Sequence, residues 1–155
     1  MAITVRKGNP QDLPAIFEMI NELAIFEKAP DSVKNSLQQM QEEKKSFDFF
    51  VAENGGKIID YALYFFAYYT WVGKSLHLDD LYVRPDLRGR KVGSMLARKV
   101  FGVAKREGCK RVRLQVLNWN SNAISIYKEW GGLISTEWIN CDFDERKISR
   151  FLRKR

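Results

Sequence analysis

The hydrophobic pattern of the first 30 residues changes from a period of two to a period near 3.6. Residues 2–6 alternate apolar and polar side chains, which predicts a strand. Asn9 and Pro10 follow, a pair typical of a helix cap and first position. The next apolar side chains recur at helical spacing and predict one buried helix face. That face consists of Leu13, Ile16, Phe17, Ile20, Leu23 and Ala24.

A polar helix and three strands are predicted next. Residues 31–45 carry only a thin apolar stripe, so we expect a surface helix there. Residues 47–53 and 57–69 read as strands joined by the Asn54-Gly55-Gly56 turn, whose residues favour positive φ. A second turn precedes a strand over 76–83. Because both turns are short, the three strands are predicted to be antiparallel neighbours.

The second half is predicted to mix helices with further strands. In order, we expect a loop (84–91), a helix (92–106), a strand (111–117), a short helix (123–130) and a closing hairpin (134–139 and 143–151). The complete order is β-α-α-β-β-β-α-β-α-β-β. This order predicts an α+β fold, with a mostly antiparallel mixed sheet flanked by helices. We expect a single domain over residues 1–155.

Composition narrows the class of protein. The 155 residues are 45% hydrophobic, which favours a folded core over disorder. The longest stretch without a charge is 14 residues (114–127), whereas a membrane helix needs about 20. The start has no apolar secretory signal, and Cys109, Cys141 and His77 have no metal-ligand spacing. We therefore expect a cytoplasmic protein with no membrane span and no metal.

The net charge of +7 is concentrated in one segment. Residues 84–113 contain 11 basic and two acidic side chains, so this window carries +9 and the rest of the chain −2. A concentrated positive segment attracts a polyanion, which leaves DNA, RNA or a phosphorylated cofactor as candidates. A solvated helix face remains the alternative for the helical part.

Residues 81–94 have the order strand, basic glycine-containing loop, helix start. The unpaired N–H groups and positive dipole at a helix N-terminus suit a phosphate. Gly89 and Gly93 allow close approach to the backbone, and Arg88, Arg90 and Lys91 add positive charge. The segment predicts a phosphate site that is neither a Walker loop nor a G-x-G-x-x-G motif.

Two segments resemble the GNAT family of N-acetyltransferases. Residues 88–93 (RGRKVG) resemble the acetyl-CoA pyrophosphate loop of that family, with Lys91 at the position of the middle glycine. Residues 118–132 resemble its N-x-x-A-I-x-x-Y-x-x-x-G segment. Within the family the chain is most similar to the spermidine/spermine (diamine) and thialysine N-acetyltransferases. This similarity is carried by residues 22–27, 62–66, 71–74 and 78–83.

The resemblance implies acetyl-CoA as cosubstrate, a small-molecule amine as acceptor and a homodimer. It implies cofactor contacts at Leu81, Tyr82, Val83, Arg88, Gly89, Arg90, Lys91, Val92, Gly93, Ser94, Asn120 and Asn122. It implies amine contacts at Phe26, Glu27, Trp71, Asp79, Asp80 and Glu137. The family commonly has Tyr and Glu where this chain has Phe26 and Asp79, a difference that bears on which amine fits.

The predicted chemistry is direct attack of an amine on the thioester in a ternary complex. A primary amine has a pKa near 10.4 and must lose a proton first, so Asp79 or a water that it holds is the expected acceptor. The backbone N–H of Leu81 would stabilise the thioester oxygen, and Tyr127 would protonate the departing thiolate. Because successive strand residues face opposite sides, at most one of Asp79 and Asp80 is expected to face the site directly.

Two other functions remain open. A protein N-acetyltransferase acting on lysine or N-terminal amines would need an open groove in place of a small acidic pocket. A non-catalytic nucleic-acid-binding module would use the basic window (84–113) and show a steep salt dependence. This last hypothesis leaves Asn120, Tyr127 and the Asp79-Asp80 pair unexplained, so we do not expect nucleic acid as a partner.

Overall fold

The computed structural model describes residues 2–89 and 91–154, in two compact units covering residues 1–115 and 116–155. The strands are β1 (Ile3–Lys7), β2 (Asp48–Asn54), β3 (Lys57–Tyr69), β4 (Gly73–Tyr82) and β5 (Val112–Leu114). The α-helices are α1 (Leu13–Phe26), α2 (Leu37–Glu42), α3 (Val92–Arg106), α4 (Ser121–Glu129) and α5 (Glu145–Arg153). Short 3-10 turns are η1 (Pro10–Asp12), η2 (Pro30–Ser32), η3 (Lys44–Ser46) and η4 (Pro85–Leu87).

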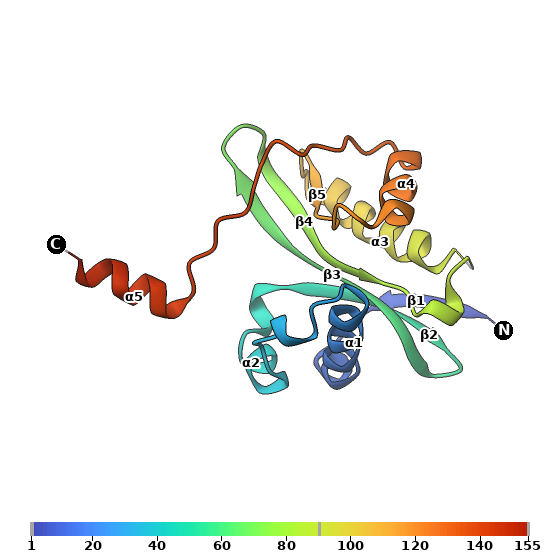
Figure 1. Ribbon diagram of the computed structural model, residues 1–155. Helices are drawn as coiled ribbons and strands as arrows, with labels where there is room; N and C mark the ends of the chain where they lie inside the picture. The colour runs from blue at the N-terminus through green and yellow to red at the C-terminus, as the bar shows by residue number, and fades with distance from the viewer. Residues whose placement is uncertain (1, 90, 155) are drawn as a thin grey trace. The chain divides into compact units, whose positions relative to one another are not determined.

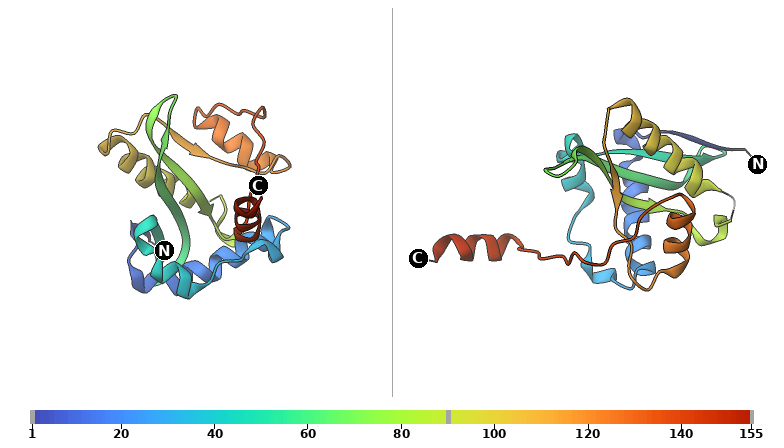
Figure 2. Two further views of the ribbon diagram at one scale, coloured as in Figure 1. Left: turned by 90° about the vertical axis from the view of Figure 1, so that its left-hand side faces the viewer. Right: turned by 90° about the horizontal axis from the view of Figure 1, so that it is seen from above.

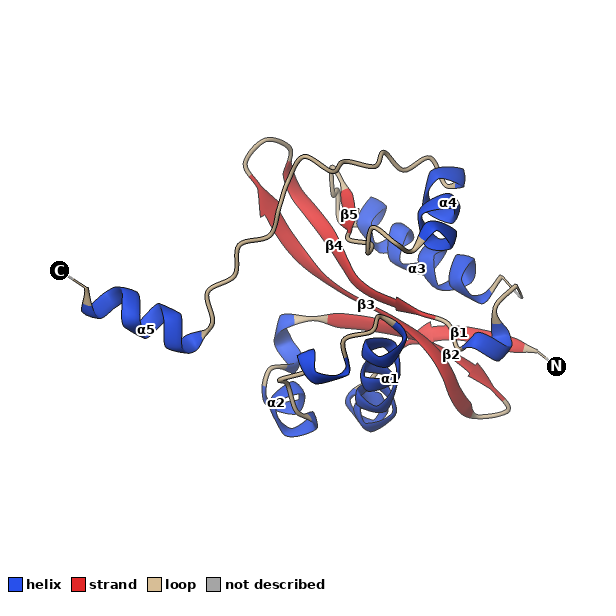
Figure 3. Ribbon diagram, in the orientation of Figure 1, coloured by secondary structure: helices blue, strands red, loops and turns tan. Residues whose placement is uncertain are grey.

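The first unit is built on one mixed sheet with the strand order β1-β2-β3-β4-β5 (Figure 3). The first four strands are antiparallel neighbours, and β4 pairs with β5 in parallel. The parallel pair is reached through α3, the kind of crossover that such a connection requires. The predicted α+β class and mixed sheet are confirmed.

Helices cover both faces of this sheet (Figures 1 and 2). On one face α3 packs its apolar stripe against the sheet, with Leu96 and Val100 fully buried. On the other face lie α1 and α2, which contribute Leu13, Ile16 and Met40 to a second core. The sheet therefore separates two hydrophobic cores, and each sheet residue belongs to one face or the other.

The predicted capping chemistry occurs at η1, the 3-10 turn that leads directly into α1. The side chain of Asn9 accepts a hydrogen bond from the backbone N–H of Gln11, and the carboxylate of Asp12 accepts one from the N–H of Asn9. Asp12 also binds the guanidinium of Arg6 at 2.8 Å. These bonds anchor the helix to β1.

Two predictions for the helices and strands are wrong. The single helix expected over 31–45 is broken into η2, α2 and η3, because Ser36 caps a new helix start at Leu37. The closing hairpin is absent as well: residues 133–144 contain no strand and α5 occupies Glu145–Arg153. The carboxylate of Asp144 caps α5 by accepting the N–H of Lys147 at 2.9 Å. A helix satisfies its own backbone groups, whereas a hairpin strand needs a neighbour.

None of the helices in the described ranges is long and apolar enough to cross a bilayer. The expectation that residues 1–155 form a single domain stays a prediction.

Candidate active site

A bulge in β4 decides which acidic side chain faces which core. In the β3–β4 register Leu78 pairs with Tyr64 and Asp80 with Leu63, so Asp79 is the extra residue. An inserted residue turns every later side chain to the opposite face. Leu78, before the bulge, packs in the α3 core, whereas Tyr82, after it, packs in the α1 core. The simple alternation expected from the sequence therefore does not apply across this point.

The bulge gives Asp80 a buried hydrogen-bond partner on β3. The hydroxyl of Tyr61 donates to Oδ2 of Asp80 at 2.7 Å. Burial raises the pKa of the Asp80 carboxyl to about 6, although the bond from Tyr61 acts in the opposite direction. The negative charges of Asp79 and Glu27 add to the increase. Asp80 is thus a carboxylate that ionises close to neutral pH.

The end of α1 completes an acidic cluster with β4. Glu27 caps this helix, and burial followed by the nearby charge of Asp79 raises the pKa of its carboxyl. The ring of Phe26 lies 4.4 Å beneath the guanidinium of Arg88. The structure therefore brings together four of the six residues expected to contact an amine, namely Phe26, Glu27, Asp79 and Asp80.

The edge of β4 is open beside this cluster. Pairing with β5 ends at Leu78 and Leu114. Among the described residues, β4 has no strand neighbour on that side from Asp79 to Tyr82. Backbone groups of this stretch, which includes Leu81, can therefore meet a ligand.

The loop after β4 leads to an uncapped helix N-terminus. The first intrahelical bond of α3 runs from the N–H of Met95 to the carbonyl of Lys91, so three N–H groups precede it. They belong to Val92, Gly93 and Ser94, and Lys91 provides no side-chain cap. This geometry fits a phosphate group. Arg90, which was also predicted to contact the cofactor, lies outside the described residues.

Glycine geometry in this loop supports close approach of a ligand. Gly89 has a φ of +84°, which residues with a side chain rarely adopt. A Cβ at this position would point into open space. A Cβ on Gly93 would lie 3.4 Å from a side-chain methyl group of Val83, the residue that follows β4. Lys91 adopts the same left-handed conformation, with a φ of +62°. The backbone of Lys91 therefore adopts a conformation that favours glycine, at a steric cost.

Replacing Lys91 by Gly is expected to stabilise the protein. Relief of about 1–2 kcal/mol of left-handed strain exceeds the roughly 0.5–1 kcal/mol of added backbone entropy. The free energy of unfolding, measured in urea, should rise by about 0.5–1 kcal/mol. Lys28, with the same φ of +62° at the end of α1, provides the matched variant Lys28→Gly. Both variants should gain stability, and only Lys91→Gly should weaken binding of the phosphorylated cofactor that the resemblance implies. A lower free energy of unfolding in Lys91→Gly would contradict the proposed backbone strain at this residue.

The second unit contains the segment predicted around Tyr127. The side chain of Asn120 caps α4 by accepting the N–H of Ala123 at 3.3 Å, and Asn122 lies in the first turn. The ring of Tyr127 meets that of Trp130 edge-on at 5.6 Å. Gly131, with a φ of +90°, ends the helix. The proposed roles of Asn120, Asn122 and Tyr127 stay predictions, as does that of the exposed Glu137.

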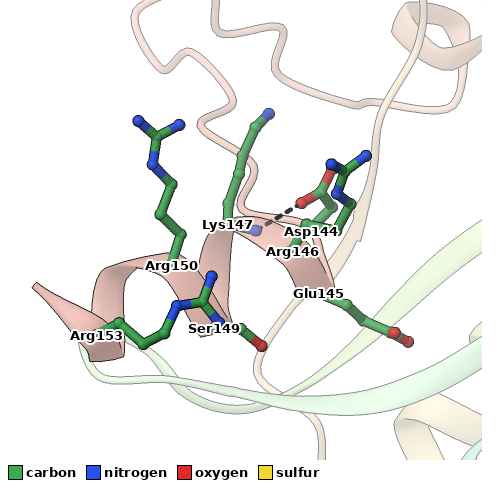
Figure 4. Close-up of a pocket in the computed structure, with 7 residues that line it drawn as sticks. All are labelled: Asp144, Glu145, Arg146, Lys147, Ser149, Arg150 and Arg153. Atoms are coloured by element: carbon green, nitrogen blue, oxygen red, sulfur yellow. Dashed lines mark hydrogen bonds between the residues drawn. The ribbon is translucent and has the colours of Figure 1, made fainter.

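A shallow depression on α5 is the other feature of this unit (Figure 4). It is lined by Asp144, Glu145, Arg146, Lys147, Ser149, Arg150 and Arg153. All of these side chains are exposed and come from one helix and its cap. The depression contains none of the residues predicted to contact the cofactor or the amine.

Trp71 does not join the acidic cluster of its own chain. It lies in the turn between β3 and β4 and is 85% exposed. Asp79 lies six positions after Gly73, the first residue of β4, a length of about 20 Å at roughly 3.3 Å per residue. Its predicted contact with the amine therefore finds no support within this chain and stays untested.

Four residues near the site were not singled out from the sequence: Glu22, Asp60, Tyr61 and Arg84. A charged residue inside an apolar strand was the available signal for Asp60. The ring of His77 stacks on Phe65 at 4.9 Å and lies 3.8 Å from a carboxylate oxygen of Asp79. Burial lowers the pKa of His77, so its ring borders the acidic cluster as a neutral group at pH 7.

An uncapped, basic helix N-terminus, an open strand edge and an acidic cluster suit the binding of a phosphorylated ligand and a cation. The acetyltransferase (GNAT) family model matches residues 13–132. The chain belongs to this family and is an acetyltransferase.

Similar proteins include thialysine N-epsilon-acetyltransferases. A thialysine N-epsilon-acetyltransferase of Sus scrofa is 37% identical over 148 residues, covering 88% of this chain and 87% of the relative. The corresponding protein of Mus musculus is 36% identical over 155 residues, covering 90% and 91%. A spermidine/spermine N(1)-acetyltransferase-like protein of Homo sapiens is 26% identical and is matched over 20% of its length.

Solved structures share the fold. An integron cassette protein from the mobile metagenome of V. cholerae superposes with a TM-score of 0.79 at 17% identity, covering 99% of both chains. An aminoglycoside acetyltransferase from a soil metagenome superposes with a TM-score of 0.76 at 14% identity, covering 92% of this chain and 95% of the other. At these identities the likeness supports the fold alone.

Proposed function

We propose that the protein transfers an acetyl group from acetyl-CoA to the primary amine of a thialysine- or lysine-like amino acid or a small polyamine. The observation that carries this proposal is the carboxylate cluster of Glu27, Asp79 and Asp80 beside the open edge of β4. A cationic amine is attracted by such a cluster. The similarity to thialysine acetyltransferases, at 36–37% identity, favours amino-acid substrates over polyamines for this protein.

The residues present fit acetyl-CoA. Arg88, Lys91 and the N–H groups at the start of α3 would hold its phosphates. The open edge of β4 would accept the extended part of the molecule. When bound, acetyl-CoA supplies the activated acetyl group that the amine attacks.

Asp80 is our proposed proton acceptor, in preference to the Asp79 favoured by the sequence. A general base works best when its pKa lies near the working pH. With a pKa of about 6, the Asp80 carboxyl is ionised at pH 7.5 and still more basic than an ordinary aspartate. Its bond from Tyr61 fixes the orientation of the carboxylate. Asp79 and Glu27 would then hold the positive charge of the amine.

Two further groups complete the proposed reaction. The N–H of Leu81 would donate to the carbonyl oxygen of the acetyl group, where negative charge develops. The hydroxyl of Tyr127 would donate a proton to the departing thiolate. Both assignments rest on the family resemblance of the surrounding segments.

The test is release of CoA thiol from acetyl-CoA with a panel of acceptors. The panel contains thialysine, lysine, spermidine, putrescine and a lysine-containing peptide. We expect strong turnover with a free amino acid or diamine and little with the peptide. Turnover with the peptide alone would favour protein acetylation. No turnover and no CoA binding would contradict the proposed function.

We further propose that the protein is a cytoplasmic homodimer. Exposed aromatic side chains on β3, including Phe66 and Tyr68 at 42% and 75% exposure, would suit a subunit interface. Cys109 and Cys141 are both free thiols, as in a reducing compartment. Sedimentation at micromolar concentration tests the dimer, and a monomer would remove this part of the proposal.

A further inference from the structure

A buried carboxylate, Asp60, lies outside the acidic cluster. It occupies β3 with 0% exposure and pairs across the strands with Ala52, a residue of the α3 core. Its Oδ1 accepts the backbone N–H of Arg84 at 2.7 Å. Its Oδ2 accepts no hydrogen bond from any described residue. A buried carboxylate with one free oxygen is costly, so its single bond to Arg84 needs an explanation.

Arg84 is the point where β4 passes into the basic loop. Two anchors hold it. Asp60 binds its backbone, and Glu22 on α1 accepts from its guanidinium, with Nε at 3.3 Å from Oε2. The hydroxyl of Tyr82 donates to the same Glu22 oxygen at 3.0 Å. Arg84 is therefore fixed from both faces of the sheet.

The geometry of the loop follows from this corner. The N–H of Leu87 donates to the carbonyl of Arg84 at 2.9 Å, and the side chain of Leu87 is buried in the α3 core. The guanidinium of Arg88 donates to the carbonyl of Val83 at 3.2 Å. A shift of Arg84 would therefore move Leu87, Arg88 and the approach to the N-terminus of α3.

We propose that Asp60 is a positioning residue for the acetyl-CoA loop: its bond to the Arg84 N–H fixes the end of β4 and thereby sets the affinity for CoA. This inference rests on the proposed function, because it assumes that residues 84–94 bind the CoA phosphates. Asp60 contacts no substrate itself and acts through Arg84.

The ionisation of Asp60 gives the proposal a signature in pH. Burial raises the pKa of its carboxyl to about 6, against the lowering effects of the Arg84 N–H bond and charge. The charges of Asp86 and Glu22 raise it further. The ionised carboxylate forms a stronger bond to an N–H than the protonated carboxyl. The anchor therefore weakens as the pH falls through about 6.

The first experiment compares three variants by CoA titration calorimetry and steady-state kinetics at pH 7.5. Asp60→Ala removes the acceptor and is expected to raise the Kd for CoA and the KM for acetyl-CoA about tenfold. Its kcat and amine KM should stay within about twofold. Asp60→Asn keeps an oxygen acceptor and should restore most of the affinity. Ser75→Ala, at a fully buried polar position near the far end of β4, should change none of these constants.

The second experiment measures CoA affinity between pH 5 and 8. The wild-type protein should lose more affinity below pH 6 than Asp60→Asn, because only the wild type has a carboxyl to protonate there. Protonation of the CoA phosphate affects both proteins equally and cancels in the comparison. The difference in pH dependence between wild type and Asp60→Asn tests the role of Asp60 even if Asp60→Ala fails to fold.

The outcomes separate the two proposals. If wild-type protein does not bind CoA, both the proposed function and this inference are overturned. If wild type binds CoA but Asp60→Ala binds equally well, or the pH profiles of wild type and Asp60→Asn coincide, only the inference is overturned. A uniform fall in kcat and stability without a change in acetyl-CoA KM would assign Asp60 a purely structural role.

Discussion

Asp80→Asn is expected to lower kcat/KM for the amine by about 100-fold or more at pH 7.5. General base catalysis by a positioned side chain contributes about 10²–10⁴ in rate, and an amide cannot accept the proton. The asparagine keeps the size of the side chain and can still accept the hydroxyl of Tyr61, so the fold should persist. Turnover at saturating acetyl-CoA provides the measurement.

The dependence of kcat/KM on pH should identify the carboxyl group that accepts the proton of the amine. The bound ammonium group can give its proton to the ionised Asp80, so log kcat/KM should be nearly flat from about pH 6 up towards the amine pKa. Below about pH 6 the slope should approach 1, because Asp80 becomes protonated. Asp80→Asn should show a slope of 1 throughout. Saturating acetyl-CoA keeps Asp60, whose pKa is also about 6, from contributing.

Two comparison variants sharpen this result. Tyr61→Phe removes the bond that lowers the pKa of Asp80, so the break in slope should move to higher pH. Asp48→Asn changes a half-exposed carboxylate on β2 and should leave the profile intact. If Asp80→Asn retains near-wild-type activity while Asp79→Asn loses it, the proton acceptor is Asp79.

Tyr127→Phe is expected to lower kcat by about 100-fold, because the departing thiolate loses its proton donor. The phenylalanine ring can keep the edge contact with Trp130, so the stability of α4 should change little. Affinity for CoA, measured by calorimetry, should remain within about threefold. The effect should therefore be on kcat, as expected for a group that acts mainly in the transition state.

Tyr68→Phe serves as the matched variant for Tyr127→Phe. Tyr68 is 75% exposed on β3, and its hydroxyl has no place in the proposed reaction. Its removal should change kcat by less than twofold. If Tyr127→Phe also retains nearly full kcat, the proposed general acid is not Tyr127 and the thiolate leaves without help from this side chain.

Basic and acidic side chains are concentrated in different parts of the chain, and each part suits one of the two proposed substrates. The basic window (84–113) contains the proposed donor site, and Glu27, Asp79 and Asp80 form the proposed acceptor site. The two regions meet where the guanidinium of Arg88 lies over the ring of Phe26. This division explains how a protein with a net charge of +7 can present a site for a cation.

Local sequence signals predicted the elements that depend on local chemistry. The ranges Lys57–Tyr69 and Val92–Arg106 match the predictions, because each has a strong period and clear end signals. The prediction of a closing hairpin was wrong because residues 143–151 fit both the period of a strand and the period of a helix. Ile148, Phe151 and Leu152 lie at helical spacing, and Asp144 provides a cap that decides for the helix.

The sequence by itself determined the fold class, the basic loop before α3 and the residue types suited to an amine and a phosphorylated donor. Only the tertiary structure decided which carboxylate is buried, because one inserted residue at Asp79 reverses the faces of β4. It likewise decided that Asp60 holds Arg84, since that bond joins residues 24 positions apart. Pairing register and burial arise from contacts between distant segments, and these contacts set the pKa of each carboxyl.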